Sequence, residues 1–148
     1  MGPLFRFFFG NLPAMKLLFE PFEVCKLVDC TYTQLRYWDI SGLLHPSKVG
    51  KRRRYTFSDL IRIQVLLAWN KVSSIQKIRK VFGSFETLLS RVSFPVSTVV
   101  IDSGRPLLFA SEVVSNRGME VVVRVRDLVG RVESLRPGFA VDSSRLLS

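Results

Sequence analysis

The chain has 148 residues, with 22 Lys and Arg against 12 Asp and Glu, so its formal net charge is +10 at neutral pH. Its hydrophobic content of 47% is enough to bury a core, which excludes disorder throughout. Two cysteines and one histidine cannot supply a four-ligand zinc site, and we expect neither a metal nor a cofactor. No stretch reaches the roughly 18 to 20 apolar residues of a membrane span, so no membrane partner is expected.

The positive charge is concentrated in the middle of the sequence. Residues 15–82 hold thirteen basic and five acidic residues, a net charge of +8. Residues 83–148 hold eight arginines and seven acidic residues, a net charge of +1, and residues 1–14 hold one arginine. A polyanionic partner is therefore expected to bind the middle segment.

Two short helices are predicted at the start of this segment. Pro21 suits the first position of a helix, and Asp29 tolerates the left-handed conformation that ends one. Thr31 precedes Gln34 by three residues, the spacing of a capping box for a second helix that runs to about Asp39. Two helices joined by so short a turn predict a helix-turn-helix.

The second helix has two chemically distinct sides. Leu35 and Trp38 are expected to face the first helix, and the outward positions are expected among Tyr32, Thr33, Arg36 and Tyr37. Polar, aromatic and cationic side chains of this kind can contact phosphates and base edges.

A basic hairpin is predicted next. Pro46 forces an extended start, and Gly50 marks a turn. The cations crowd into this hairpin and its approach to Tyr55; they are Lys48, Lys51, Arg52, Arg53 and Arg54. The hairpin is either a wing that lies along a phosphate backbone or a solvated basic loop.

Two more helices are expected after the hairpin. Thr56 or Ser58 caps a third helix that ends near Asn70, and Ser73 or Ser74 opens a fourth. Apolar residues then recur at steps of three and four from Ile75 to Val92, with an interruption at Gly83-Ser84. This series is typical of a short dimer-forming helix or of a helix that faces its own core.

Several linked motifs resemble the MerR family of bacterial transcription regulators. Residues 23–38 resemble the helix-turn-helix of the family, and their Leu-Arg-Tyr-Trp ending is similar to its Leu-Arg-Tyr-Tyr. Residues 40–46 resemble the entry to its wing, residues 53–60 the exit into its third helix, and residues 73–78 the start of its fourth helix. The resemblance covers about residues 21–82.

The resemblance implies a winged-helix domain that binds double-stranded DNA, usually as a homodimer on a two-fold symmetric site. Carried across by position, Thr33, Arg36 and Tyr37 fall at recognition-helix contacts, and Arg52, Arg53 and Arg54 at wing contacts. The residues expected to bind DNA are Thr33, Arg36, Tyr37, Lys48, Lys51, Arg52, Arg53, Arg54 and Tyr55. Asp29 departs from the turn glycine that is common in the family, and the long dimerisation helix of its typical regulators is not evident.

The C-terminal third has a different pattern. Residues 98–101 and 106–109 flank the turn signal 102–104 and predict a hairpin, and 116–118 is a second turn signal. Val121, Val123 and Val125 alternate with polar residues, which indicates a strand. Asp127 to Leu135 fits either a closing helix or a continued strand. So small a module is expected to pack against the first domain or a second copy.

The predicted fold class is α+β, a winged helix-turn-helix followed by a small, mainly β module. Residues 1–14 are expected to be an extension, either a loose arm or a start assigned too far upstream. The DNA-binding domain is expected over 15–82 and a connecting or dimerisation helix over 83–94. The β-rich module follows over 95–137, and a flexible tail over 138–148.

The sequence predicts a cytoplasmic transcription regulator that binds specific double-stranded DNA sequences. We expect no enzyme, because neither a nucleophile with a base nor paired carboxylates are visible. The alternative is an accessory DNA-binding protein, such as an excisionase-like recombination factor or an antitoxin-like partner, which senses no ligand. A protein-interaction role for the basic hairpin is a third possibility. The sequence names no small-molecule effector.

Overall fold

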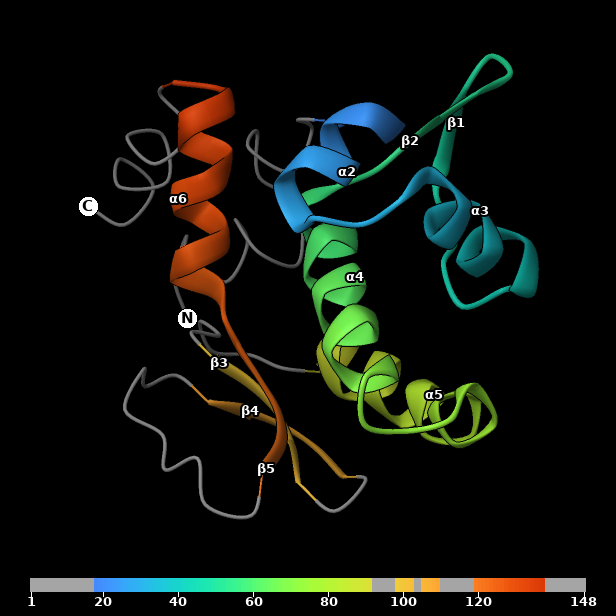
Figure 1. Cartoon of the computed structure of the whole chain (residues 1–148), viewed down its shortest axis with the longest axis vertical. Coiled ribbons are helices and arrows are strands. Elements are labelled where there is room, and N and C mark those ends of the chain that lie inside the picture. The colour runs from blue at the N-terminus through green and yellow to red at the C-terminus, as the bar shows by residue number, and fades with distance from the viewer. Residues whose placement is uncertain (1–17, 92–97, 103–104, 110–118, 138–148) are drawn as a thin grey trace.

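The computed structural model describes residues 18–91, 98–102, 105–109 and 119–137 (Figure 1). The helices are α2 (Pro21–Val28), α3 (Tyr32–Ser41), α4 (Phe57–Asn70), α5 (Ile75–Arg91) and α6 (Val125–Leu135). The strands are β1 (Ser47–Val49), β2 (Arg52–Arg54), β3 (Thr98–Asp102), β4 (Arg105–Phe109) and β5 (Met119–Arg124). The fold is α+β, as predicted. No helix of the described segments is long and apolar enough to cross a membrane.

Local capping interactions fix the boundaries of the first helices. The hydroxyl of Thr31 accepts the N–H of Gln34 at 3.1 Å, and the Gln34 side chain accepts the N–H of Thr31 at 2.9 Å, so the predicted capping box of α3 is confirmed. Thr56, not Ser58, caps α4 through the same reciprocal bonds with Asp59. Asp29 ends α2 with a φ of 55°.

The predicted wing is an antiparallel hairpin. Strands β1 and β2 pair with Val49 opposite Arg52 and Ser47 opposite Arg54. Gly50 lies in the turn with a φ of 66°, a conformation that glycine adopts without a steric penalty. A bridge between Phe19 and Tyr55 anchors the base of the hairpin to the chain that leads into α2.

The last strands form a three-stranded antiparallel sheet in the order β4-β3-β5. The predicted hairpin is confirmed, while its turn at 103–104 and the turn signal at 116–118 lie outside the described residues. The sheet packs against α4 and α5, with β5 beside α4 and β4 beside α5. The central strand β3 is buried from Thr98 to Ile101, which fits its apolar sequence.

One prediction for this region was wrong. Val125 and Arg126 do not continue the strand, because β5 ends at Arg124 and α6 begins at Val125. Val125, Leu128 and Val132 recur at helical spacing and are all buried. From Val125 onward the burial therefore follows the helical period and not the two-residue alternation of a strand. Of the two alternatives for Asp127 to Leu135, the structure has the helix.

The fourth predicted helix continues through Gly83-Ser84 without a break. Ile78, Phe82 and Phe85 are buried, and the last two rings pack with their centroids 5.3 Å apart. The apolar series that suggested a dimer-forming helix is therefore used, over these residues, inside the core of the chain itself.

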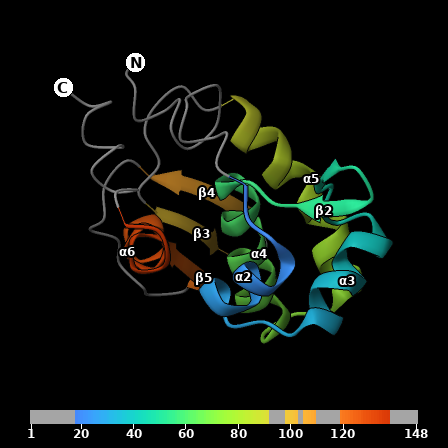
Figure 2. The ribbon, with the colours of Figure 1, turned by 90° about the horizontal axis from the view of Figure 1, so that it is seen from above.

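The C-terminal elements share one hydrophobic core with the helix-turn-helix. The core cluster joins residues of α2, α3 and α4 to Val99, Ile101 and Val123 of the sheet and to Leu128 and Val132 of α6. Seen from above, α6 and α3 lie on opposite sides of α4 (Figure 2). The helix-turn-helix is thus braced by the segment that follows it.

Arg136, just after α6, makes several polar contacts between these two parts. Its guanidinium donates to both carboxylate oxygens of Glu23, at 2.9 and 3.1 Å, and to the carbonyl of Leu18 at 2.8 Å. It also lies over the Phe19 ring, 4.7 Å from the centroid. Glu23 in turn accepts the N–H of Glu20, so the arginine supports the first turn of α2.

We expect Arg136→Ala to lower the free energy of unfolding by about 1.5 to 3 kcal/mol, the usual contribution of a hydrogen bond to a charged group. Urea denaturation measures the change. Arg79→Ala removes an exposed arginine of α5 and is the matched control. Equal effects of the two substitutions would contradict a bracing role for Arg136.

Candidate nucleic-acid interface

Helix α3 exposes one continuous polar and aromatic face. Thr33, Arg36, Tyr37 and Ile40 recur at helical spacing and are all exposed, while Leu35 and Trp38 on the opposite side are buried. Tyr37 keeps 47% of its surface accessible and Ile40 keeps 68%. The face thus offers a hydroxyl, a guanidinium, a phenol and an aliphatic group to a partner.

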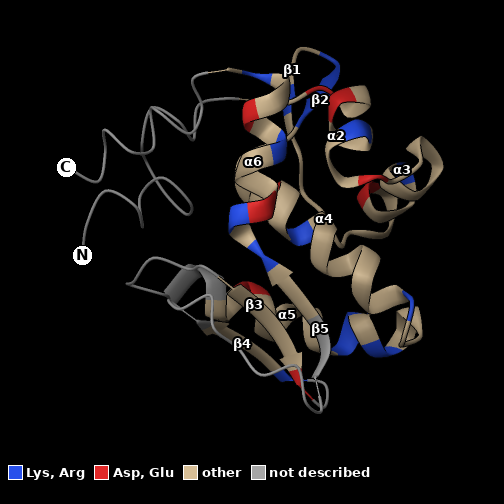
Figure 3. Cartoon of the chain, turned by 60° about the vertical axis from the view of Figure 1, so that its left-hand side comes forward, with Lys and Arg blue, Asp and Glu red and all other residues tan. Residues whose placement is uncertain are grey.

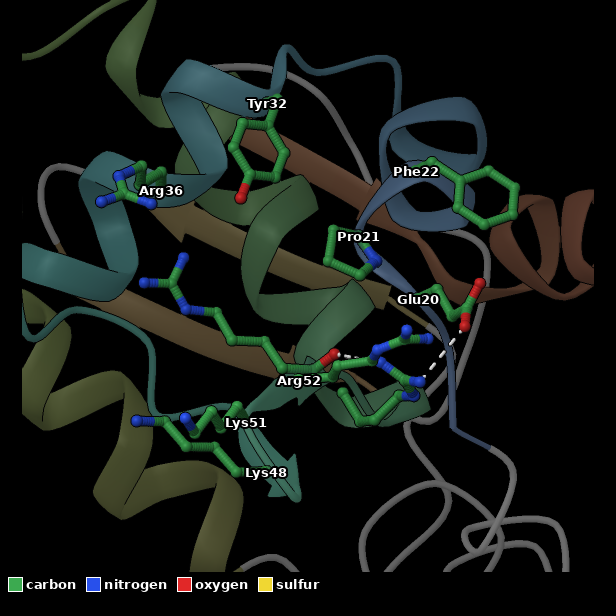
Figure 4. A pocket seen from close by; sticks show the side chains of 10 residues that line it. Glu20, Pro21, Phe22, Tyr32, Arg36, Lys48, Lys51 and Arg52 are labelled. Atoms are coloured by element: carbon green, nitrogen blue, oxygen red, sulfur yellow. Dashed lines mark hydrogen bonds and ion pairs between the residues drawn. The ribbon is translucent and has the colours of Figure 1, made fainter.

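A groove of about 560 Å³ separates this helix from the hairpin (Figure 4). Arg52 extends from β2 toward Arg36 on α3, and the Tyr32 hydroxyl points into the same space. Lys48 and Lys51 line the groove from the hairpin. The groove is lined by six cations and a single carboxylate, and its lining residues are Glu20, Pro21, Phe22, Tyr32, Arg36, Lys48, Lys51, Arg52, Arg53 and Arg54.

Basic residues mark the β1–β2 hairpin in Figure 3, and their side chains fall into two groups. Arg53 pairs with Asp39 at 3.4 Å, and Arg54 pairs with Glu20 at 3.2 Å and donates to the carbonyl of Arg53 at 2.9 Å. Both arginines are half-buried. Lys48, Lys51 and Arg52 are exposed and make no ion pair with any described residue. Their charge is therefore available to a partner.

Asp39 joins α3 to the base of the hairpin. Its side chain is only 3% exposed, and its Oδ2 atom accepts the Tyr55 hydroxyl and faces the Arg53 guanidinium. The other oxygen, Oδ1, accepts no hydrogen bond from the described residues. Burial raises the pKa of Asp39, although the hydrogen bond from Tyr55 and the charge of Arg53 oppose this shift.

Tyr55 keeps its proton in this arrangement. Burial raises the pKa of its hydroxyl strongly, and the hydrogen bond to Asp39 raises it further. The hydroxyl is therefore a permanent donor to the carboxylate. The helix and the hairpin are connected through a buried side chain from each.

Residues 22–83 match the family model described as the MerR HTH family regulatory protein. These residues form a MerR-family helix-turn-helix domain. No curated protein matches the chain. The predicted family is confirmed, and the chain contains the DNA-binding domain of a transcription regulator.

The MerR domain exposes most of the residues predicted to contact DNA. Thr33, Arg36 and Tyr37 lie on the open face of α3, and the exposed hairpin cations line the groove beside it. Tyr55 is different, because it has no exposed surface and is bonded to Asp39. The structure places Tyr55 in the core.

Three residues of the site were missed by the sequence analysis. Asp39 follows Leu35 by one helical turn, and this spacing could have placed it on the inner side of α3. Glu20 contacts Arg54 across 34 positions, and the sequence offers no local signal for such a contact. Phe22 lines the groove and is 58% exposed.

The raised pKa of Asp39 gives a test of the buried contact. A carboxyl with a pKa higher in the folded than in the unfolded protein contributes stability below its unfolded pKa, near 3.8, and loses it as the pH rises through the folded pKa. Relative to Asp39→Asn, we expect the unfolding free energy of the wild type to fall over that window by about 1.4 kcal/mol per unit of pKa difference.

Urea titrations of both proteins at a series of pH values from below 3.8 to neutrality measure this difference. Asp29→Asn, which removes an exposed carboxylate, is the matched control. A constant difference between wild type and Asp39→Asn at all pH values would contradict the assignment.

Proposed function

We propose that this protein binds specific double-stranded DNA sequences with α3 in the major groove and the β1–β2 hairpin along the phosphate backbone. The observation that carries the proposal is the groove between α3 and the hairpin, where Arg36, Lys48, Lys51 and Arg52 have no carboxylate partner among the described residues. Cations that line one groove repel one another unless an anion lies between them, so the groove suits a phosphate chain.

The dimensions and chemistry of α3 support major-groove binding. Ten residues give a helix about 15 Å long, which the major groove of B-DNA admits. Arg36 can donate two hydrogen bonds to a guanine, and Ile40 offers an apolar contact to a thymine methyl group. Thr33 and Tyr37 complete a face that can read base edges and hold phosphates.

The hairpin contributes affinity of a different kind. Lys48, Lys51 and Arg52 are exposed and read no bases in this arrangement, so their contacts with phosphates release counterions on any sequence. Arg53 and Arg54 are engaged by Asp39 and Glu20, and in our proposal they hold the hairpin in position rather than supply the main phosphate contacts.

Regulation of transcription by a homodimer on a two-fold symmetric site is the reading that the family suggests. Two copies of α3 would then bind half-sites about one helical turn apart, roughly 34 Å. Selection of bound fragments from genomic DNA with the purified protein tests this reading, because an inverted repeat at that spacing would be recovered.

An accessory DNA-binding role is favoured by one observation. The sheet and α6 pack into the same core as the MerR domain, so they brace it instead of forming a separate body that could bind an effector. Recovery of single, asymmetric sites, together with no effect on transcription from a nearby promoter, would favour this accessory role over a regulator.

The free cations of the hairpin give a quantitative test. We expect the Lys48→Ala, Lys51→Ala and Arg52→Ala triple variant to bind all DNA sequences more weakly. The slope of log affinity against log salt should also become shallower by about 0.9 for each phosphate that the variant no longer neutralises. Fluorescence anisotropy over a range of salt concentrations measures both quantities.

Arg105→Ala is the control for this experiment, since β4 lies at the other end of the molecule from the hairpin (Figure 1). It should leave the slope unchanged. A triple variant with the wild-type slope would rule out the hairpin as a phosphate-binding element.

Arg36→Ala should act on specificity instead. Removal of a bidentate hydrogen bond to a base costs about 1 to 3 kcal/mol of discrimination, so the ratio of specific to non-specific affinity should fall by roughly 5-fold to 150-fold. Competition binding with selected and scrambled DNA measures this ratio, and Arg52→Ala serves as the comparison. An equal decrease in affinity for both DNAs would assign Arg36 to a phosphate.

A further inference from the structure

Two cysteines meet at the turn of the helix-turn-helix. Cys25 lies in α2 and Cys30 follows its end, and their Sγ atoms are 3.8 Å apart with the thiol of Cys30 donating to Cys25. Both side chains are half-buried. Asp29, in the left-handed conformation, turns the chain back, and the N–H of Cys30 then bonds to the carbonyl of Cys25 at 3.3 Å. The backbone itself therefore holds the two sulfurs together.

We propose that Cys25 and Cys30 form a reversible intrachain disulfide that weakens DNA binding. The effect on DNA rests on the function proposed above, whereas the disulfide rests only on the position of the two sulfurs. Two thiols whose sulfurs lie 3.8 Å apart are within reach of each other, and a bond between them would span the turn that joins α2 to the recognition helix α3.

The chemistry requires a two-electron oxidant, and a hydroperoxide is the class that we propose. The Cys25 sulfur attacks the peroxide oxygen, which breaks the O–O bond, releases water or an alcohol and leaves a sulfenic acid. The Cys30 sulfur then attacks the Cys25 sulfur and displaces water, with its own proton transferred to the leaving oxygen. Two thiols are oxidised, and the peroxide is reduced. A dithiol reverses the reaction by exchange.

The environment of the pair assigns the order of attack. Burial raises the pKa of Cys30 to about 12, and the neighbouring Cys25 sulfur contributes to this shift. Cys30 therefore keeps its proton and stays the donor of the S–H···S contact, which leaves Cys25 as the sulfur that meets the oxidant.

Bond formation would move the start of the recognition helix. A disulfide is about 2.05 Å long, so the sulfurs must approach by about 1.7 Å. Cys30 is bonded directly to Thr31, the residue that caps α3. The opposite end of α3 is held by Asp39 to the hairpin, so the movement falls on the N-terminal turn of α3 and on the position of Tyr32 and Thr33.

The full chain, reduced and then treated with hydrogen peroxide, provides the test. We expect intact-mass spectrometry to report a monomer lighter by two hydrogen atoms, and thiol titration to report the loss of both thiols. The oxidised protein should bind the selected DNA at least about tenfold more weakly, a difference of about 1.4 kcal/mol. Dithiothreitol should restore both the mass and the affinity.

Cys25→Ser and Cys30→Ser are the matched controls, because serine keeps the size and the hydrogen-bonding capacity of the thiol. Both variants should bind DNA like the reduced wild type, before and after peroxide, which separates the disulfide from oxidation elsewhere in the chain. A variant that failed to fold would be replaced by the corresponding alanine substitution.

Two results would overturn the proposal. One is the absence of an intrachain disulfide under peroxide, and the other is a disulfide that leaves the DNA affinity unchanged. If the reduced protein bound no DNA at all, the proposed function would fail, while the mass measurement would still decide whether the two cysteines react with each other.

Discussion

The buried carboxylate of Asp39 is the constraint on which the relative placement of α3 and the β1–β2 hairpin depends. It lies in the last turns of α3, and it contacts the Arg53 guanidinium of β2 and the hydroxyl of Tyr55, which directly follows that strand. A carboxylate removed from water is costly unless it is paired. One neutral and one charged donor at Oδ2 offset part of this cost, and they tie α3 to the base of the hairpin.

This pairing divides the basic hairpin into structural and available charges. Arg53 and Arg54 neutralise Asp39 and Glu20, so their side chains are held against the protein. Lys48, Lys51 and Arg52 have no such partner in the described chain, and they face solvent together with Arg36. The number of basic residues in a segment therefore overstates the positive charge that is available to a partner, because some of these residues form ion pairs within the protein.

Local chemistry made much of the N-terminal half predictable from sequence. The capping box of Thr31 and Gln34, the turn at Asp29 and the glycine of the hairpin each act within a few residues, and all of them are found as predicted. Long-range pairs gave no such signal. The ion pair of Arg136 with Glu23 spans 113 positions, and neither residue differs in local pattern from an ordinary surface charge.

The residues of the site show the same difference between local features, which the sequence predicts, and long-range contacts, which it does not. The exposed face of α3 follows from helical periodicity, whereas the buried Tyr55 hydroxyl finds its partner in a carboxylate sixteen residues away. The transition from β5 to α6 was missed at Val125, because strand alternation and helical spacing both fit the first residues of the helix. Only the burial of Leu128 and Val132 in the shared core distinguishes the two.

The way α5 and the sheet pack has a consequence for how two copies could associate. Ile78, Phe82 and Phe85 are buried within the chain, and β4 covers α5 on the side of the sheet. An apolar stripe that is already covered gains little by meeting a second copy, since the area removed from water is what drives association. The C-terminal elements are also engaged within the chain, because Arg136, just after α6, pairs with Glu23 of α2. Any dimer formed by this protein must therefore be built on other surfaces than these three buried side chains of α5.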